Sequence, residues 1–234
     1  MPVELARLEP AQWAEPPSLP NVAPVVPTPD MVHHLIEAAE QSRRPEYAWA
    51  ILVAATTGVR RAELCALRRQ RNVNWDRGLL TVTASIAEIK DVPLHEIPTK
   101  NRRVRSLALD DLTLSILRAQ VDMLEERAAL CRVELDPDAY LFTDDVEGNV
   151  PWRPDVISKY FGRLRDRAEL KDLRFHDLRR FMETYGQEMG YSVAQVAMRA
   201  GHDPSVAARH YSGRVVETDR DLAQAVASLL TPRP

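Results

Sequence analysis

Residues 46–56 constrain the fold more than any other stretch of this sequence, because they are apolar on nearly every side. A helix of this composition has to be surrounded by other parts of the protein. Thr57 and Gly58 follow it and are typical of a helix end. The nearly uncharged run 48–59 is too short to cross a membrane, which takes about 20 residues. We therefore expect a buried helix at the centre of one globular domain, and 234 residues are enough to build it.

Helical patterns dominate most of the remaining chain. Thr28 and Pro29 form a helix start, in which an N-cap residue is followed by a proline in the first turn. Asp110 begins a long helix that runs to about residue 130. Further helices are predicted at 61–67, 153–170, 176–189, 192–200, 204–211 and 218–230.

The middle of the chain changes to the pattern of a β-strand. Residues 79–89 are rich in β-branched and apolar side chains, and residues 104–109 are predicted to pair with them. The connection contains Pro93, Pro98 and a basic segment, so we expect it to be mobile. The predicted fold class is mainly α with a small antiparallel β-sheet (α+β).

The first part of the chain differs from the rest in composition. Residues 1–27 contain closely spaced prolines and are predicted to form a linker or arm ahead of a single domain at 28–234. We expect no secretion leader. The two cysteines, Cys65 and Cys131, suit a reduced cytoplasmic protein and are expected to be buried or half-buried. They are too few to suggest a metal site.

Charge is unevenly distributed along the sequence. The net charge of -3 counts against a nucleic-acid partner, since DNA-binding domains usually carry basic excess. However, residues 110–147 hold eleven acids against three arginines, whereas residues 60–71 hold five arginines and one glutamate. Residues 100–105 add four more cations and no acid. This distribution predicts a basic face and an acidic back.

Four motifs follow one another in a fixed order and carry the strongest functional signal. They are Thr57-Gly58-Val59-Arg60-Arg61-Ala62-Glu63-Leu64, Thr99-Lys100-Asn101-Arg102-Arg103, His176-Asp177-Leu178-Arg179-Arg180, and Ala200-Gly201-His202 with Tyr211 nine residues after the histidine. Each motif alone is weak. Together, over about residues 28–230, they resemble the tyrosine recombinase family, which includes the phage integrases.

The resemblance implies a DNA phosphodiester as the reacting group. Arg60 and Arg179 are then expected to clamp the phosphate, because a guanidinium donates two hydrogen bonds and keeps its charge. Tyr211 is expected to attack phosphorus and form a 3′-phosphotyrosyl link. The bond energy is conserved in that link, so no cofactor is expected. The interpretation requires Arg60 and Arg179 to reach a common anion.

The resemblance also suggests which groups move protons. His202 or His176 is expected to accept the proton of the tyrosine, and Lys100 to protonate the leaving 5′-hydroxyl. Lys90 is the alternative to Lys100. Glu63 is expected to orient an arginine or a histidine.

Three more arginines are expected to touch the DNA backbone: Arg102, Arg103 and Arg180. In the family the third motif often ends in histidine, and here Arg180 stands at that position.

The resemblance therefore implies a site-specific DNA recombinase, or integrase, that binds double-stranded DNA as a homotetramer. The isolated domain is expected to be monomeric and to bind DNA weakly, with no metal, cofactor or membrane partner. Two alternatives stay open: a type IB topoisomerase that relaxes DNA, and a DNA-binding protein without catalysis. The apolar stripe of the last helix, 218–230, is predicted to pack on its own domain or on a neighbouring subunit.

Overall fold

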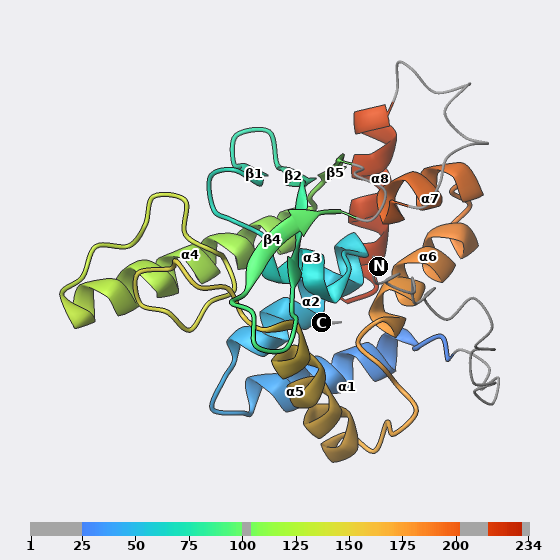
Figure 1. Ribbon diagram of the computed structural model, residues 1–234. Coiled ribbons are helices and arrows are strands. Elements are labelled where there is room, and N and C mark those ends of the chain that lie inside the picture. The colour runs from blue at the N-terminus through green and yellow to red at the C-terminus, as the bar shows by residue number, and fades with distance from the viewer. Residues whose placement is uncertain (1–24, 100–103, 202–214, 231–234) are drawn as a thin grey trace, which may run out of the picture.

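The central element is helix α2, Glu46–Thr57, as the sequence predicts (Figure 1). The structure is a computed structural model that describes residues 25–99, 104–201 and 215–230. Nearly every residue of α2 is buried. It packs against α1 (Pro29–Glu40), α4 (Asp111–Cys131), α6 (Asp177–Glu188) and α8 (Val215–Ser228). Helices from both ends of the sequence therefore share one core.

The helix boundaries follow from local signals in the sequence. Thr28 caps α1 by accepting a hydrogen bond from the Met31 amide, and Asp110 caps α4 in the same way. The other helices are α3 (Arg61–Cys65), α5 (Pro154–Arg167) and α7 (Val193–Ala200). Each begins within a residue or two of its predicted start, except that α8 begins three residues before the predicted one. The helix predicted at 204–211 lies outside the described residues.

The strand region forms two small sheets, where the sequence analysis expected one. β1 (Val73–Asn74), β2 (Leu79–Val82) and β5 (Arg105–Ala108) make an antiparallel sheet in the order β1-β2-β5. The predicted pairing of β2 with β5 is confirmed, with Leu80 opposite Leu107.

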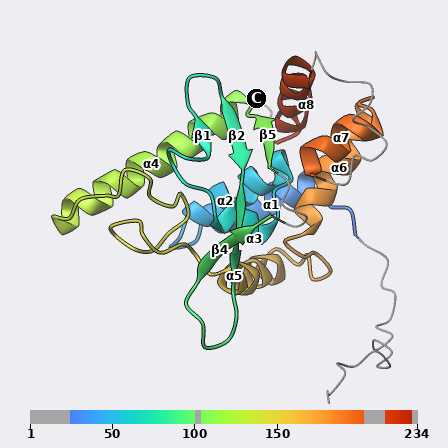
Figure 2. The ribbon, with the colours of Figure 1, turned by 45° about the horizontal axis from the view of Figure 1, so that its top comes forward.

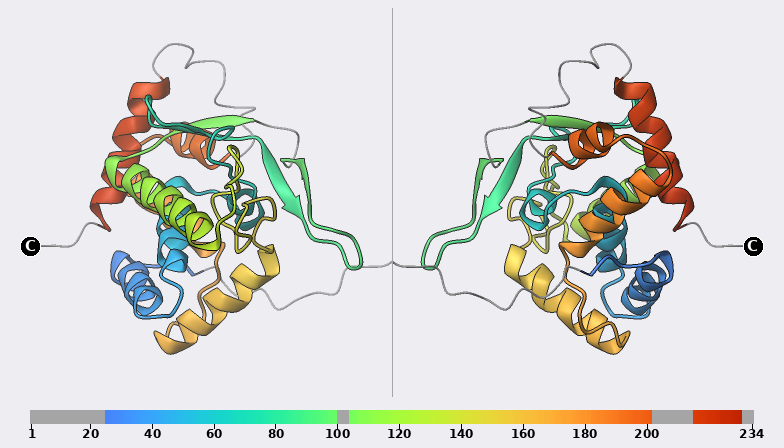
Figure 3. Two further views of the ribbon diagram at one scale, coloured as in Figure 1. Left: turned by 90° about the vertical axis from the view of Figure 1, so that its left-hand side faces the viewer. Right: turned by 90° about the vertical axis from the view of Figure 1, so that its right-hand side faces the viewer.

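The prediction of one continuous strand over residues 79–89 is wrong. The strand breaks at Thr83, and β3 (Ala84–Ala87) pairs instead with β4 (His95–Pro98) in a second sheet. β4 was missed because Pro98 within it and Pro93 just before it argued against a strand. Pro98 is tolerated because β4 has a neighbour on one side only and Pro98 ends it. The β3–β4 hairpin projects from the helical body (Figure 3).

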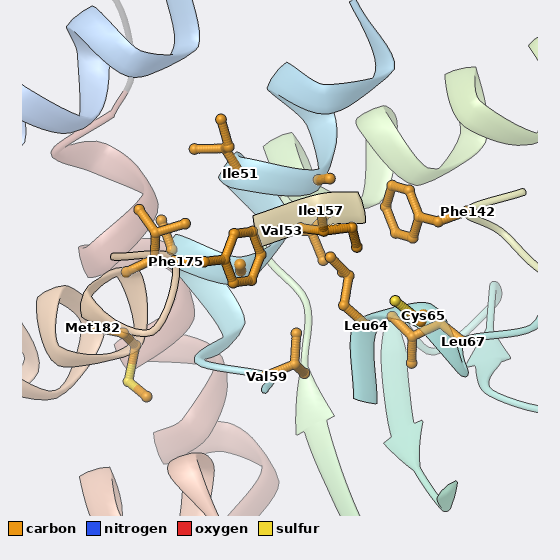
Figure 4. Packing of buried hydrophobic residues seen from close by; sticks show 14 of the residues in the cluster. Ile51, Val53, Val59, Leu64, Cys65, Leu67, Phe142, Ile157, Phe175 and Met182 are labelled. Carbon is orange, nitrogen blue, oxygen red and sulfur yellow. The ribbon is translucent and has the colours of Figure 1, made fainter. Parts of the chain in front are cut away.

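The apolar core joins α2 to elements that come much later in the chain. Figure 4 shows Ile51 and Val53 of α2 near Ile157 of α5 and Phe175, which precedes α6. All four side chains are buried. The core therefore fixes α6 and the segment before it relative to the end of α2.

Helix α8 packs on its own domain. Leu222 and Val226 are fully buried, and the helix lies against β5 and α6 (Figure 2). Asp219 binds the buried guanidinium of Arg199 at 2.9 Å and accepts a hydrogen bond from the Ala108 amide. Of the two arrangements that the sequence left open, the structure shows the one in which α8 packs on its own domain.

Two smaller expectations can also be compared with the structure. Cys65 is buried as expected, but Cys131 is exposed, because it is the last residue of α4. Among the described residues, every helix is too short or too polar to traverse a lipid bilayer.

Gly58 provides a test of how the core fixes the end of α2. Its φ of 67° is left-handed, and a Cβ there would overlap the Cε of Met182. We expect Gly58→Ala to lower the free energy of unfolding by about 2 kcal/mol. Gly162 in α5 has open space around it, so Gly162→Ala should raise stability by up to about 1 kcal/mol. Urea unfolding of both variants measures the difference, and equal effects would contradict this account.

Candidate active site

Arg60 lies at the start of α3, directly after the turn that ends α2. Its Nη1 donates to Oε1 of Glu63 at 2.7 Å, and its backbone amide donates to Oε2 at 2.9 Å. Glu63 comes three residues later on α3 and is fully buried, whereas 29% of the Arg60 side chain is exposed. Glu63 therefore anchors one end of the Arg60 guanidinium and leaves part of it accessible.

The same carboxylate also binds a second arginine, Arg105 of β5. Its Nη2 donates to Oε2 of Glu63 at 2.7 Å and its Nη1 to Oε1 at 3.2 Å. Burial alone would raise the pKa of Glu63, but the hydrogen bonds and charges of Arg105 and Arg60 lower it to about 2. Glu63 is therefore a permanent buried anion at neutral pH.

Arg179, in the first turn of α6, reaches the end of α2 close to Arg60. Its Nη1 donates to the carbonyl of Gly58 at 2.9 Å, and its Nε donates to Glu183 at 2.9 Å. The side chain is 2% exposed. Burial, followed by the nearby charge of Arg60, lowers the pKa of Arg179 to about 10. Arg179 thus lies close enough to Arg60 to feel its charge, but it is nearly fully buried and is not among the residues that line the pocket around Arg60. That both guanidinium groups reach one anion stays a prediction.

His176 and Arg60 line one pocket of about 540 Å³. Burial lowers the pKa of His176, and the charges of Arg179 and Arg180 lower it further, which favours the neutral imidazole at pH 7. The pocket is also lined by three more arginines, Arg61, Arg165 and Arg174. None of its described lining residues is acidic, and Val59, Phe161 and Phe175 supply apolar walls. Such a pocket suits an anion.

Arg180, a predicted DNA contact, is held by a carboxylate. Its Nη1 lies 2.6 Å from Asp177, and 36% of its side chain is exposed. Asp177 also accepts a hydrogen bond from the Arg174 backbone amide at 2.8 Å. The ion pair leaves Arg180 partly accessible, so a phosphate contact by this residue stays a prediction.

Five of the predicted site residues lie outside the described part of the chain: Lys100, Arg102, Arg103, His202 and Tyr211. The structure describes residues next to Lys100, Arg103 and His202, but none next to Tyr211. Thr99, directly before Lys100, is buried, and Gly201, directly before His202, is the C-cap of α7.

The sequence analysis missed Arg105 and Arg199 as parts of this arrangement. Arg199 is fully buried, and its Nη2 donates to the carbonyl of Thr56 at 3.1 Å, near the end of α2. The spacing of apolar residues could have predicted that both arginines lie on the buried face of their strand or helix. Arg105 shares a strand face with buried Leu107, and Arg199 lies on α7 beside buried Val196 and Ala200.

The chain is similar to known phage integrases. The model of the phage integrase family matches residues 26–215. A putative prophage phiRv2 integrase of Mycobacterium tuberculosis is 23% identical over 194 residues, which cover 83% of this chain and 49% of that protein. The chain therefore spans about half the length of the curated relatives that it matches.

Solved structures show the same fold at low sequence identity. The Tn1549 transposon integrase, in complex with a circular intermediate DNA, superposes with a TM-score of 0.63 at 16% identity, over 82% of this chain and 62% of that one. The integrase from mycobacterium phage Brujita gives 0.63 at 17% identity, over 94% and 63%. The XerA recombinase gives 0.57 at 21% identity, over 94% and 68%.

The lowered pKa of Glu63 predicts that the stability of the fold depends on pH. Because folding lowers its pKa, the ionised carboxylate stabilises the fold above about pH 4.5, and this contribution is lost as the pH falls toward 2. We expect Glu63→Gln to lower the free energy of unfolding at pH 7 by about 3 kcal/mol. The difference from the unmodified protein should shrink as urea unfolding is repeated at lower pH.

The control is Glu125→Gln, which removes an exposed partner of Arg69 in a 2.8 Å ion pair. Its effect should stay within about 0.5 kcal/mol at every pH. A pH-independent loss for Glu63→Gln would show that the charge of this carboxylate is not what stabilises the fold.

Proposed function

Because this chain belongs to the phage integrase family of tyrosine recombinases, we propose that it breaks and rejoins DNA at a specific site through a 3′-phosphotyrosyl intermediate. The proposal rests on one observation. Arg179 lies close enough to Arg60 for the charge of Arg60 to lower its pKa further after burial, and Arg60 and His176 line the same pocket. A phosphodiester gains negative charge on its oxygens during attack, and fixed cationic donors stabilise that charge.

Charge repulsion in the site supports a phosphate ligand. Burial, followed by the positive charge of Arg60, disfavours the charged form of Arg179 and lowers its pKa. A phosphate at the accessible part of Arg60 offsets this repulsion and can accept paired hydrogen bonds from that guanidinium. Glu63 neutralises part of the charge but lies fully buried beneath Arg60, so it leaves the accessible side of that guanidinium for a ligand.

The proposed reaction has two balanced steps. In the first, the oxygen of Tyr211 bonds to phosphorus, its proton passes to His202 or His176, and the bond to the 5′-oxygen breaks as Lys100 protonates that oxygen. In the second, the 5′-hydroxyl of another strand attacks the phosphotyrosine and the protons return. One phosphodiester replaces another, so the exchange needs no high-energy cofactor. The roles of Lys100, His202 and Tyr211 rest on the family motifs alone.

We also propose double-stranded DNA and further copies of this chain as partners. Exchange between two duplexes requires a nucleophile for each of the cut strands, which a homotetramer on the DNA supplies. The isolated chain is proposed to be a monomer, because α8 already buries Leu222 and Val226 within its own domain. The proposed location is the cytoplasm of a bacterium or of a phage-infected cell, where such DNA is accessible.

A covalent trapping experiment tests the proposed reaction. A nicked duplex with the attachment site, identified by sequencing around the gene, loses its short 5′-hydroxyl strand after cleavage, so the protein cannot rejoin it. We expect the unmodified chain to give a covalent DNA adduct on a denaturing gel. Tyr211→Phe should give none, because its side chain lacks the attacking oxygen.

Tyr185→Phe and Tyr191→Phe are the matched controls for this experiment, since they remove other tyrosine hydroxyls near the site in sequence. Both should retain the adduct. An adduct that persists in Tyr211→Phe would refute the assignment of the nucleophile.

The arginine-lined pocket predicts how DNA binding depends on salt. Arg174 lines this pocket and is exposed, whereas exposed Arg118 lies on α4 outside it. Each lost phosphate contact reduces the slope of log affinity against log salt by about 1. We expect that change for Arg174→Ala and none for Arg118→Ala, measured by fluorescence anisotropy. Equal slopes for the two variants would place the DNA elsewhere.

A further inference from the structure

Arg105 makes three separate contacts in the centre of the site. Its Nη1 and Nη2 bind the two oxygens of Glu63 at 3.2 and 2.7 Å. Its Nε donates to the carbonyl of Arg199 at 3.2 Å, in the last turn of α7. Its side chain also packs against Gly201, where a Cβ would lie only 2.9 Å from the Cδ and Nη1 of Arg105. Glu63 and the Arg199 carbonyl together occupy its Nε, Nη1 and Nη2, so the donors of Arg105 are already used within the protein.

These contacts lie next to both segments that carry the remaining proposed catalytic groups. Arg105 begins β5, where its pairing with Val82 fixes the backbone, and it follows Lys100 by five residues. On the other side it binds α7 at Arg199 and packs on Gly201, the residue before His202. One side chain therefore connects the anchor of Arg60 to the described ends of both segments.

We propose that Arg105 is a positioning residue that sets the distance between the Arg60 clamp and the described ends of β5 and α7. This inference rests on the proposed strand-transfer function. Arg105 does not touch the DNA in this account. It acts through Glu63, which orients Arg60, and through the ends of β5 and α7.

The chemistry of the side chain explains why arginine suits this position. A guanidinium has a rigid plane with donors on both edges, so it can bind a carboxylate with two nitrogens and a carbonyl with the third. A lysine has one nitrogen and keeps the charge but cannot reach both acceptors in this geometry. Arg105→Lys thus separates the charge of the residue from its positioning role.

The test compares Arg105→Lys with Arg68→Lys in the trapping reaction. Arg68 is also a partly buried arginine paired with a glutamate, Glu96, at 2.9 Å, but it is not part of the site. We expect Arg105→Lys to lower the cleavage rate at saturating DNA by about 10- to 100-fold, as small misplacements of catalytic groups do. The DNA concentration for half-maximal rate should change less than about twofold, because phosphate contacts are unaffected. Arg68→Lys should match the unmodified chain in both quantities.

A double-mutant cycle with Glu63 tests the route of the effect. If Arg105 acts through Glu63, the variant with both Arg105→Lys and Glu63→Gln should lose little more rate than the worse single variant. Glu63→Asp keeps the charge and shortens the side chain, so it should also lower the rate without weakening DNA binding. Rates are divided by the fraction of folded protein, measured by circular dichroism, so that partial unfolding does not imitate a catalytic loss.

The outcomes separate this inference from the proposed function. If the unmodified chain forms no adduct on the attachment site, the proposed function fails, and this inference fails with it. If the unmodified chain forms the adduct and Arg105→Lys is equally fast, only the positioning role is refuted. A loss confined to the half-maximal DNA concentration, or losses that multiply in the double variant, would likewise overturn it.

Discussion

The buried carboxylate of Glu63 is the constraint on which the rest of the site depends. It accepts hydrogen bonds from the Arg60 amide and from the guanidinium groups of Arg60 and Arg105. A charged group without solvent has to keep such partners, since losing one leaves an unpaired buried charge. The carboxylate therefore holds α3 and β5 at a fixed separation and fixes the direction in which Arg60 points.

Three arginines, Arg60, Arg105 and Arg179, lie around the single negative charge of Glu63. This excess of positive charge suggests an anionic ligand. Arg179 lies close enough to Arg60 and Arg105 that their charges, after burial itself, lower its pKa. The hydrogen bond of Arg179 to the Gly58 carbonyl ties α6 to the end of α2, so the guanidinium groups cannot move apart freely. A net charge of -3 for the whole chain is compatible with DNA binding because Arg60, Arg61, Arg165 and Arg174 line one pocket without an acidic residue among its described lining.

Much of the fold could be predicted because helix signals are local. Thr28, Asp110 and Ser192 cap helices in the structure as their side chains suggest. The strand region was predicted less well. The distant pairing of β2 with β5 was predicted, but the nearby pairing of β3 with β4 was missed, because Pro93 and Pro98 made that segment resemble a loop. Residues 79–89 have one continuous pattern, yet the strand breaks at Thr83 and its two halves join different sheets. Which partner each half takes depends on the surrounding packing.

The sequence by itself determined the helical framework, the buried character of α2 and the order of the motifs that include Arg60, Glu63, His176 and Arg179. Only the tertiary structure decided which cations line the pocket and which are internal. Arg105 and Arg199 look like surface cations in a basic stretch and a short helix, yet both are held inside by carboxylates and carbonyls from distant segments. The physical reason is that a charge is buried only when folding brings its partners to it, and those partners are not neighbours in sequence.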